Sequence, residues 1–90
     1  MGVDDPGDPL EFPAEIPVKV MGEAEDDFES WVVSVVRRHV DDLGEGAVRT
    51  RRSRRGRYLS VTVTVRARSR EQMDALYREL SGHERVKVVL

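Results

Sequence analysis

The 90-residue chain contains no cysteine and only two histidines, His39 and His83. Without cysteine it can form no disulfide, no thiolate nucleophile and no zinc site with cysteine ligands. No serine shows a nucleophile-elbow pattern, and the histidines lack the spacing of a helical zinc motif. We therefore expect no catalytic residues, no metal and no cofactor, and we predict that the protein is not an enzyme.

Long apolar runs are missing as well. No stretch approaches the roughly 20 apolar residues that a membrane helix needs. The first thirty residues show neither the basic start nor the apolar segment of a secretory signal. The sequence therefore predicts a cytoplasmic protein that makes no membrane contact.

Lysine is scarce, because the 15 basic residues include only Lys19 and Lys87, and the charges are unevenly distributed. Residues 1–30 contain ten acids and one base, which gives a net charge of −9. Residues 49–70 contain nine arginines and no acid, which gives +9. The overall charge of −2 thus combines two oppositely charged segments.

The first fifteen residues differ in composition from the rest of the chain. They contain three prolines, two glycines and five acids, a mixture that opposes a packed helix or a central strand. We expect residues 1–15 to form an acidic, largely disordered arm and residues 16–90 to form one domain.

Within residues 16–90, hydrophobic periodicity predicts six elements. Apolar residues alternate with polar ones near both ends of the domain and most clearly from Leu59 to Ala67, whereas Phe28 to His39 and Met73 to Leu80 follow helical spacing. Ser69 and Gln72 have the spacing of a capping box. The predicted order is strand 16–21, helix 28–39, strand 47–52, strand 58–68, a helix between Ser69 and Gly82, and strand 86–90.

This order is the ferredoxin-like βαββαβ arrangement of the α+β class. Two right-handed crossovers would place both helices on one face of a four-stranded antiparallel sheet with strand order 4-1-3-2. In the last strand, alternation predicts that Val86, Val88 and Leu90 face the core. The other sheet face would be open and carry Lys19, Met21, Tyr58, Ser60, Thr62, Thr64, Lys87 and Val89.

Several short sequence matches resemble the YbeD-like family of small uncharacterised bacterial proteins. They include Leu10-Glu11-Phe12-Pro13, Lys19-Val20-Met21-Gly22, Arg38-His39, Ser60-Val61, Leu76-Tyr77 and the terminal Val89-Leu90. The resemblance covers about residues 10–90. It implies the same βαββαβ fold, similar to that of the ACT regulatory domain.

An ACT-like fold implies a small-molecule site where the first strand meets the first helix. Met21, Gly22 and Glu23 occupy that position, and a glycine lets a ligand approach the backbone. Four acids between positions 23 and 27 would repel an anion there. An effector at this site would therefore be a cationic or zwitterionic metabolite.

Six arginines within residues 49–57 form the densest charge feature, and guanidinium groups suit phosphate or an acidic partner. The same element order occurs in RNA-recognition motifs, but Arg57 and Leu59 stand where those motifs stack aromatic rings. This disfavours sequence-specific RNA recognition and leaves non-specific nucleic-acid contact open. The arginines are Arg49, Arg51, Arg52, Arg54, Arg55 and Arg57.

The open sheet face is the third candidate surface, for a protein partner or for self-association. We predict primarily a regulatory or adaptor protein that acts through protein–protein interaction. A small-molecule sensor and a weak RNA or DNA binder are the alternatives. The residues assigned to the sheet-face interaction are Lys19, Tyr58, Ser60, Thr62 and Thr64.

Overall fold

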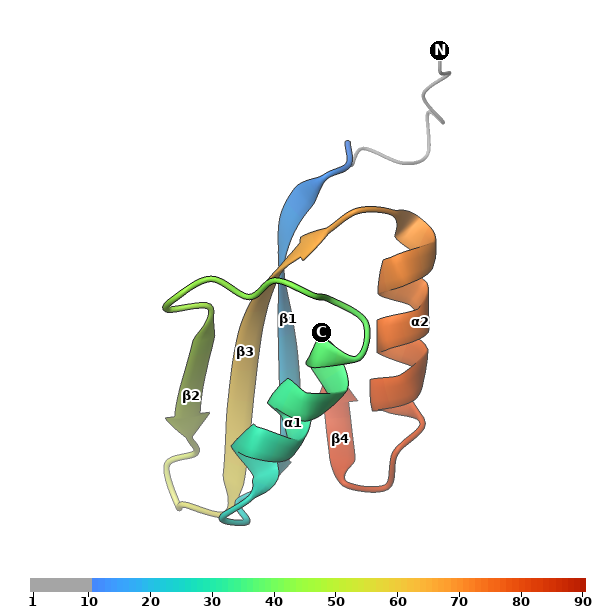
Figure 1. The fold of residues 1–90 in the computed structure, drawn as a ribbon. Coiled ribbons are helices and arrows are strands. Elements are labelled where there is room, and N and C mark those ends of the chain that lie inside the picture. Colours follow the sequence, from blue (N-terminus) through green and yellow to red (C-terminus); the bar gives the residue numbers. More distant parts are fainter. Residues whose placement is uncertain (1–10) are drawn as a thin grey trace.

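The computed structural model describes residues 11–90, so most of the predicted acidic arm lies outside the described residues. Six elements follow one another in the predicted order (Figure 1). They are β1 (Ala14–Glu23), α1 (Phe28–Arg37), β2 (Val48–Arg52), β3 (Tyr58–Ala67), α2 (Arg70–Ser81) and β4 (Val86–Val89).

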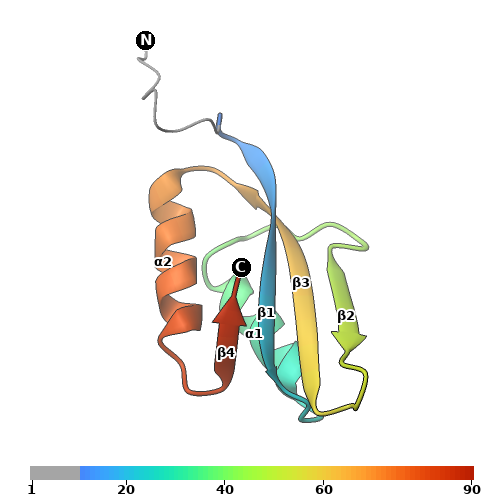
Figure 2. The same ribbon diagram turned by 180° about the vertical axis from the view of Figure 1, so that it is seen from behind.

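The four strands form one antiparallel sheet in the order β2-β3-β1-β4, which confirms the predicted ferredoxin-like topology. β1 and β3 are the long central strands, paired from Ala14 opposite Ala67 to Glu23 opposite Tyr58. Both helices lie on the same side of the sheet (Figure 1). From the opposite side, no helix stands in front of the strands (Figure 2).

Valine alternation on the central strands builds the core. Val18 and Val20 of β1 and Val61, Val63 and Val65 of β3 are fully buried under the helices. Their β-branched side chains suit a pleated surface with one buried face. The helices complete this core with fully or almost fully buried residues, namely Phe28, Val32, Val35 and Val36 of α1 and Leu76 and Leu80 of α2.

β1 begins earlier than the sequence analysis placed it. Ala14 and Glu15, assigned to the arm, pair with Ala67 and Arg66 at the end of β3. Pro13, which immediately precedes them, lies outside the strand. The start of β1 predicted from composition is therefore two residues too late, because pairing with the long strand β3 extends β1 to Ala14.

The prediction for β4 was wrong in its last residues. The pairing with β1 shifts between Met21 and Gly22, so that Met21 lies opposite Val88 and Gly22 opposite Val86. Lys87 is the extra residue of this β-bulge, and the bulge breaks the period of two. Val89 therefore packs against the core instead of lying on the open face, while Val88 and Leu90 are 42% and 67% exposed.

Candidate binding surface on the open sheet face

Strand register arranges the open face in cross-strand rows. In one row, Arg49 of β2 lies opposite Thr62 of β3, and Thr62 lies opposite Lys19 of β1. Leu90 closes this row, because its backbone exchanges hydrogen bonds of 2.8 and 3.0 Å with Lys19. The neighbouring row runs Arg51, Ser60, Met21 and Val88. Each row therefore changes from basic at the β2 edge to apolar at the β4 edge.

A hollow of about 360 Å³ lies on the basic side of this face. We call it the open-face hollow. It joins two sets of residues that the sequence analysis had assigned to different surfaces, the arginine segment and the sheet face. Its lining residues are Lys19, Arg49, Thr50, Arg51, Ser60 and Thr62.

The cations of the open-face hollow are not neutralised by the rest of the domain. No carboxylate lines it. Lys19, Arg49 and Arg51 take part in none of the ion pairs formed within residues 11–90. Thr50 lies opposite the core residue Val61, and its hydroxyl donates a hydrogen bond to Glu29 of α1, so that hydroxyl belongs to the helix side of the sheet and not to the hollow. The arrangement favours an anionic ligand or partner.

The remaining predicted arginines belong to the turn between β2 and β3, which we call the arginine turn (residues 52–57). Arg52 donates a hydrogen bond of 3.0 Å to the carbonyl of Gly56, whose φ of +75° suits glycine. Arg57 lies 5.6 Å from the centroid of the Tyr58 ring, within cation–π range. Arg54 and Arg55 are exposed and have no carboxylate partner among the described residues.

Of the sheet-face residues, Thr64 and Tyr58 lie beyond the two ends of the hollow. Thr64 is opposite Pro17, and Tyr58 is opposite Glu23. The three other predicted residues, Lys19, Ser60 and Thr62, line the hollow itself. Three of the five predicted sheet-face residues therefore share the hollow, and the other two do not.

At the predicted effector site of Met21, Gly22 and Glu23, the protein's own atoms pack closely against Gly22. A Cβ added to Gly22 would stand 2.5 Å from the Phe28 ring and 2.4 Å from the carbonyl oxygen of Arg85. The protein's own atoms therefore fill the space that the sequence analysis gave to a ligand. Met21 and Glu23 lie on the opposite, open face, where Glu23 comes within 4.0 Å of the Lys87 amino group.

Arg85 explains the acids at the start of α1, and sequence reasoning missed it. Its guanidinium lies 2.7 Å from Asp27 and 3.3 Å from Glu25, and 5.2 Å from the centroid of the Trp31 ring. The hydrogen bond from Arg85 lowers the pKa of Asp27 and raises the pKa of Arg85 itself. These contacts tie the start of α1 to the start of β4. The available signal in the sequence was a cluster of acids directly before a helix whose first turn carries two aromatic residues, Phe28 and Trp31.

Each histidine makes contacts within the domain. His39 Nε2 lies 2.6 Å from Glu79, and Arg38 also pairs with that carboxylate. These two partners lower the pKa of Glu79 and link the end of α1 to α2. The His83 ring packs against the Trp31 ring at an angle of 48°, with centroids 4.5 Å apart. Across residues 11–90 no group of three or more metal-ligating side chains occurs, and no helix is long and apolar enough to cross a membrane.

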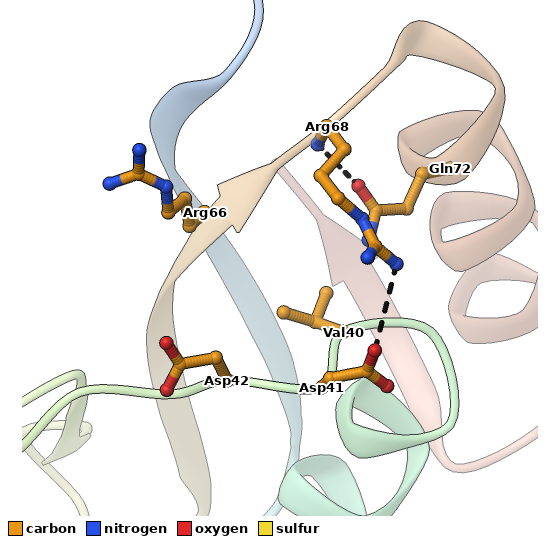
Figure 3. A pocket seen from close by; sticks show the side chains of 6 residues that line it. All are labelled: Val40, Asp41, Asp42, Arg66, Arg68 and Gln72. Carbon is orange, nitrogen blue, oxygen red and sulfur yellow. Dashed lines mark hydrogen bonds and ion pairs between the residues drawn. The ribbon is translucent and has the colours of Figure 1, made fainter.

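In a second, smaller pocket, of about 100 Å³, arginines and carboxylates occur together (Figure 3). Arg66 of β3 and Arg68, which follows the strand, line it with Asp41 and Asp42. Arg68 lies 3.7 Å from Asp41 and donates its backbone N–H to Gln72 at 2.5 Å. Carboxylates accompany the arginines here, whereas the open-face hollow has none.

These features define a ferredoxin-like α+β domain with a basic hollow on its open sheet face. Residues 8–90 match the family described as "Protein of unknown function (DUF493)", and the chain belongs to that family. This membership confirms the resemblance to the YbeD-like proteins.

Bacterial relatives cover nearly the whole chain. The chain is 52% identical to a UPF0250 protein of Janthinobacterium sp. (strain Marseille) over 81 residues, which are 90% of this chain and 89% of the relative. It is 49% identical to a UPF0250 protein of Paraburkholderia phytofirmans, with 90% and 91% covered. A UPF0250 protein of Neisseria meningitidis is 44% identical, with 90% and 89% covered. These names state no activity, so function has to be argued from the site.

Proposed function

We propose that the protein is a non-catalytic adaptor that binds an acidic, extended segment of a partner protein along β2 and the arginine turn. The observation that carries this proposal is the set of arginines without carboxylate partners along this edge, above all Arg54 and Arg55. We expect the partner to be cytoplasmic, as the sequence analysis predicts for the chain itself.

The backbone of β2 supports the same mode of binding. β2 pairs with β3 on one side, and within residues 11–90 no strand pairs with its other edge. Free N–H and C=O groups on an edge strand can accept an added strand. Arginines on such an edge oppose pairing with the same edge of a second copy and with other basic segments. An acidic segment offsets this repulsion, and charge complementarity then increases the association rate.

A labelled peptide tests this proposal. We would titrate the protein into a fluorescein-labelled peptide of about eight alternating Glu and Val residues, long enough to pair along β2. A peptide with Lys in place of Glu is the matched ligand control. We expect the acidic peptide to bind saturably and more weakly as salt increases, and the basic peptide to show no binding.

The matched variants have equal changes in charge. R54A/R55A removes two exposed arginines from the arginine turn, and R37A/R78A removes two exposed arginines from the helices. We expect the turn variant to bind the acidic peptide about tenfold more weakly, a loss of about 1.4 kcal/mol, and the helix variant to bind it like wild type. Equal losses in the two variants would contradict the adaptor proposal.

Contact with nucleic acid is the second candidate, because the same exposed guanidinium groups suit phosphate. A labelled single-stranded RNA in the same titration distinguishes a nucleic-acid binder from an adaptor for an acidic peptide. RNA binding that is tighter than peptide binding near physiological salt, and that is lost in R54A/R55A, would favour the nucleic-acid binder.

A further inference from the structure

We propose that the open-face hollow binds a small molecule carrying a chain of two or three phosphates. The hollow brings together Lys19, Arg49 and Arg51, with the hydroxyls of Ser60 and Thr62 among them. Guanidinium and ammonium groups with neighbouring hydroxyl donors form the donor set that phosphate oxygens accept.

The spacing of the cations favours more than one phosphate. Arg49 and Lys19 lie on β2 and β1, on either side of Thr62 of β3. Two strand spacings separate their backbones by roughly 10 Å. Arg51 adds a third cation two residues along β2, beside Ser60. A short polyphosphate chain lying across β3 can pair each cation with a different phosphate group, whereas a single phosphate would have to draw all three side chains together.

The electrostatic cost of binding is small, because an incoming anion displaces no carboxylate. The cations of the hollow form no ion pair within residues 11–90, unlike Arg68, which pairs with Asp41 in the smaller pocket (Figure 3). The backbone that carries the two hydroxyls is held in place, since Ser60 and Thr62 belong to the central strand β3, which pairs on both sides.

The size of the site fits a small ligand. A volume of about 360 Å³ falls at the lower end of the range known for small-molecule sites, which is about 300–1,000 Å³. The face is accessible, because α1 and α2 both lie behind the sheet when it is viewed from this side (Figure 2).

The two proposed sites share β2, because Arg49 and Arg51 line the hollow and also lie on the strand along which the peptide would pair. They differ beyond β2, because the anion would also use Lys19 of β1 and the peptide would also use the arginine turn. The matched pair of variants is therefore K19A/R49A for the hollow and R54A/R55A for the turn. Each removes two positive charges from exposed side chains, so neither should impair folding.

Isothermal titration calorimetry with sodium tripolyphosphate tests the proposal on the full chain. We expect one site per chain for wild type, with an affinity at least about tenfold above that for inorganic phosphate at matched ionic strength, since the chain offers each cation its own phosphate group. Tripolyphosphate should also raise the melting temperature, and the rise should continue with the logarithm of its concentration above the dissociation constant. K19A/R49A should bind it at least about tenfold more weakly, and R54A/R55A within about threefold of wild type.

Three results would overturn the proposal. Wild type that shows no saturable heat would do so, as would K19A/R49A binding as tightly as wild type. Equal losses in K19A/R49A and R54A/R55A would show that diffuse positive charge, and no defined site, attracts the anion. The acidic-peptide titration is independent, because its decisive variant leaves Lys19 and Arg49 in place.

Discussion

At the scale of single residues, Gly22 has the tightest surroundings among the described glycines. It lies in β1 where the Phe28 ring and the Arg85 carbonyl meet, and both are within 2.5 Å of the position a Cβ would take. A side chain at this position would push α1 away from the sheet or displace the turn before β4. The glycine is therefore needed for close packing of three segments.

We predict that Gly22→Ala lowers the free energy of unfolding by about 1–3 kcal/mol, the usual cost of overpacking a closed site. Gly44→Ala is the control, since no atom lies within 4 Å of its added Cβ and its φ is not positive. Urea unfolding of both variants provides the measurement. A Gly22→Ala protein as stable as Gly44→Ala would contradict the close approach.

Asp27 should make stability depend on pH. Its pKa lies below the ordinary value of 3.8, chiefly because Arg85 donates hydrogen bonds to the carboxylate. A pKa lowered by folding means that the ionised form stabilises the folded state. That contribution is complete above the pKa of the unfolded chain and is lost as the pH falls through the lower, folded value.

We predict that Asp27→Asn lowers the melting temperature near neutral pH and that the difference from wild type shrinks as the pH falls below 3.8. Asp26→Asn is the control, because Asp26 forms no ion pair within residues 11–90. Thermal scans across the acidic range check this. A difference that stays constant from neutral to acidic pH would exclude the Arg85 interaction as its origin.

The contacts of Arg85 mark a limit of sequence reasoning at this scale. Acids at the start of a helix are usually explained by the helix dipole, which is a local effect. Asp27 in fact makes no side-chain capping hydrogen bond and pairs instead with a residue 58 positions away. Pairing over such a distance follows from β4 lying beside β1, and no local pattern encodes it.

At the scale of the elements, the two longest strands could be predicted and the last strand only in part. Alternation in β1 and β3 holds because every residue pairs in register across ten positions. Alternation in β4 fails because the bulge at Lys87 depends on how β4 meets β1 at Gly22. A period of two therefore predicts which sheet face a side chain lies on only where the strand contains no inserted residue.

Because of the bulge, the neighbouring residues Val88 and Val89 should differ in how much an added charge lowers the free energy of unfolding. We expect Val89→Asp to lower the free energy of unfolding by about 2 kcal/mol or more, because it places a carboxylate against the core. Val88→Asp should change it by no more than about 0.5 kcal/mol, because Val88 is on the open face. Chemical denaturation of both variants decides. The reverse order of stability would restore simple alternation and remove the bulge.

The start of α2 behaves as its sequence indicates. Ser69 accepts a hydrogen bond of 3.1 Å from the backbone N–H of Gln72, as the capping prediction requires. The Gln72 side chain reaches one residue further back than a standard capping box, to the N–H of Arg68, and also donates to the carbonyl of His39. The cap therefore also links α2 to the end of α1.

We predict that Ser69→Ala lowers the free energy of unfolding by about 1 kcal/mol, the usual cost of removing an N-cap hydroxyl. Ser81→Ala, at the exposed last residue of the same helix, should have almost no effect. Both values come from urea denaturation followed by circular dichroism. Equal effects of the two substitutions would refute the capping role of Ser69.

At the scale of the whole molecule, the sequence could name candidate binding residues but did not group them. Arginines of β2 and polar residues of β3 and β1 were assigned to separate surfaces, although the predicted strand order already placed β3 between β2 and β1. The missing information was the register, which puts Arg49 and Lys19 on either side of Thr62. The hydrophobic period does not determine which residues of neighbouring strands lie opposite one another.

Net charge should influence anion binding over long range. The three acids that precede residue 11 bring the chain to −2, and without their charge it would carry +1. We predict that Asp4→Asn/Asp5→Asn/Asp8→Asn strengthens tripolyphosphate binding by up to about threefold at low ionic strength. This difference should vanish near about 0.5 M salt, where screening extends only a few ångströms. Calorimetry at the two salt concentrations tests this, and a gain that persists at high salt would contradict a long-range effect.

The turn between β2 and β3 also offers an engineering opportunity. Its exposed residues, Ser53 to Arg55, contribute nothing to the buried core, and the strands it joins are aligned by their own pairing. A two-residue Asn-Gly connection, which matches the twist of paired strands, could therefore replace it. The product would be a shortened scaffold with the same sheet and without the basic tip, and recognition loops of other sequences could be grafted at that position.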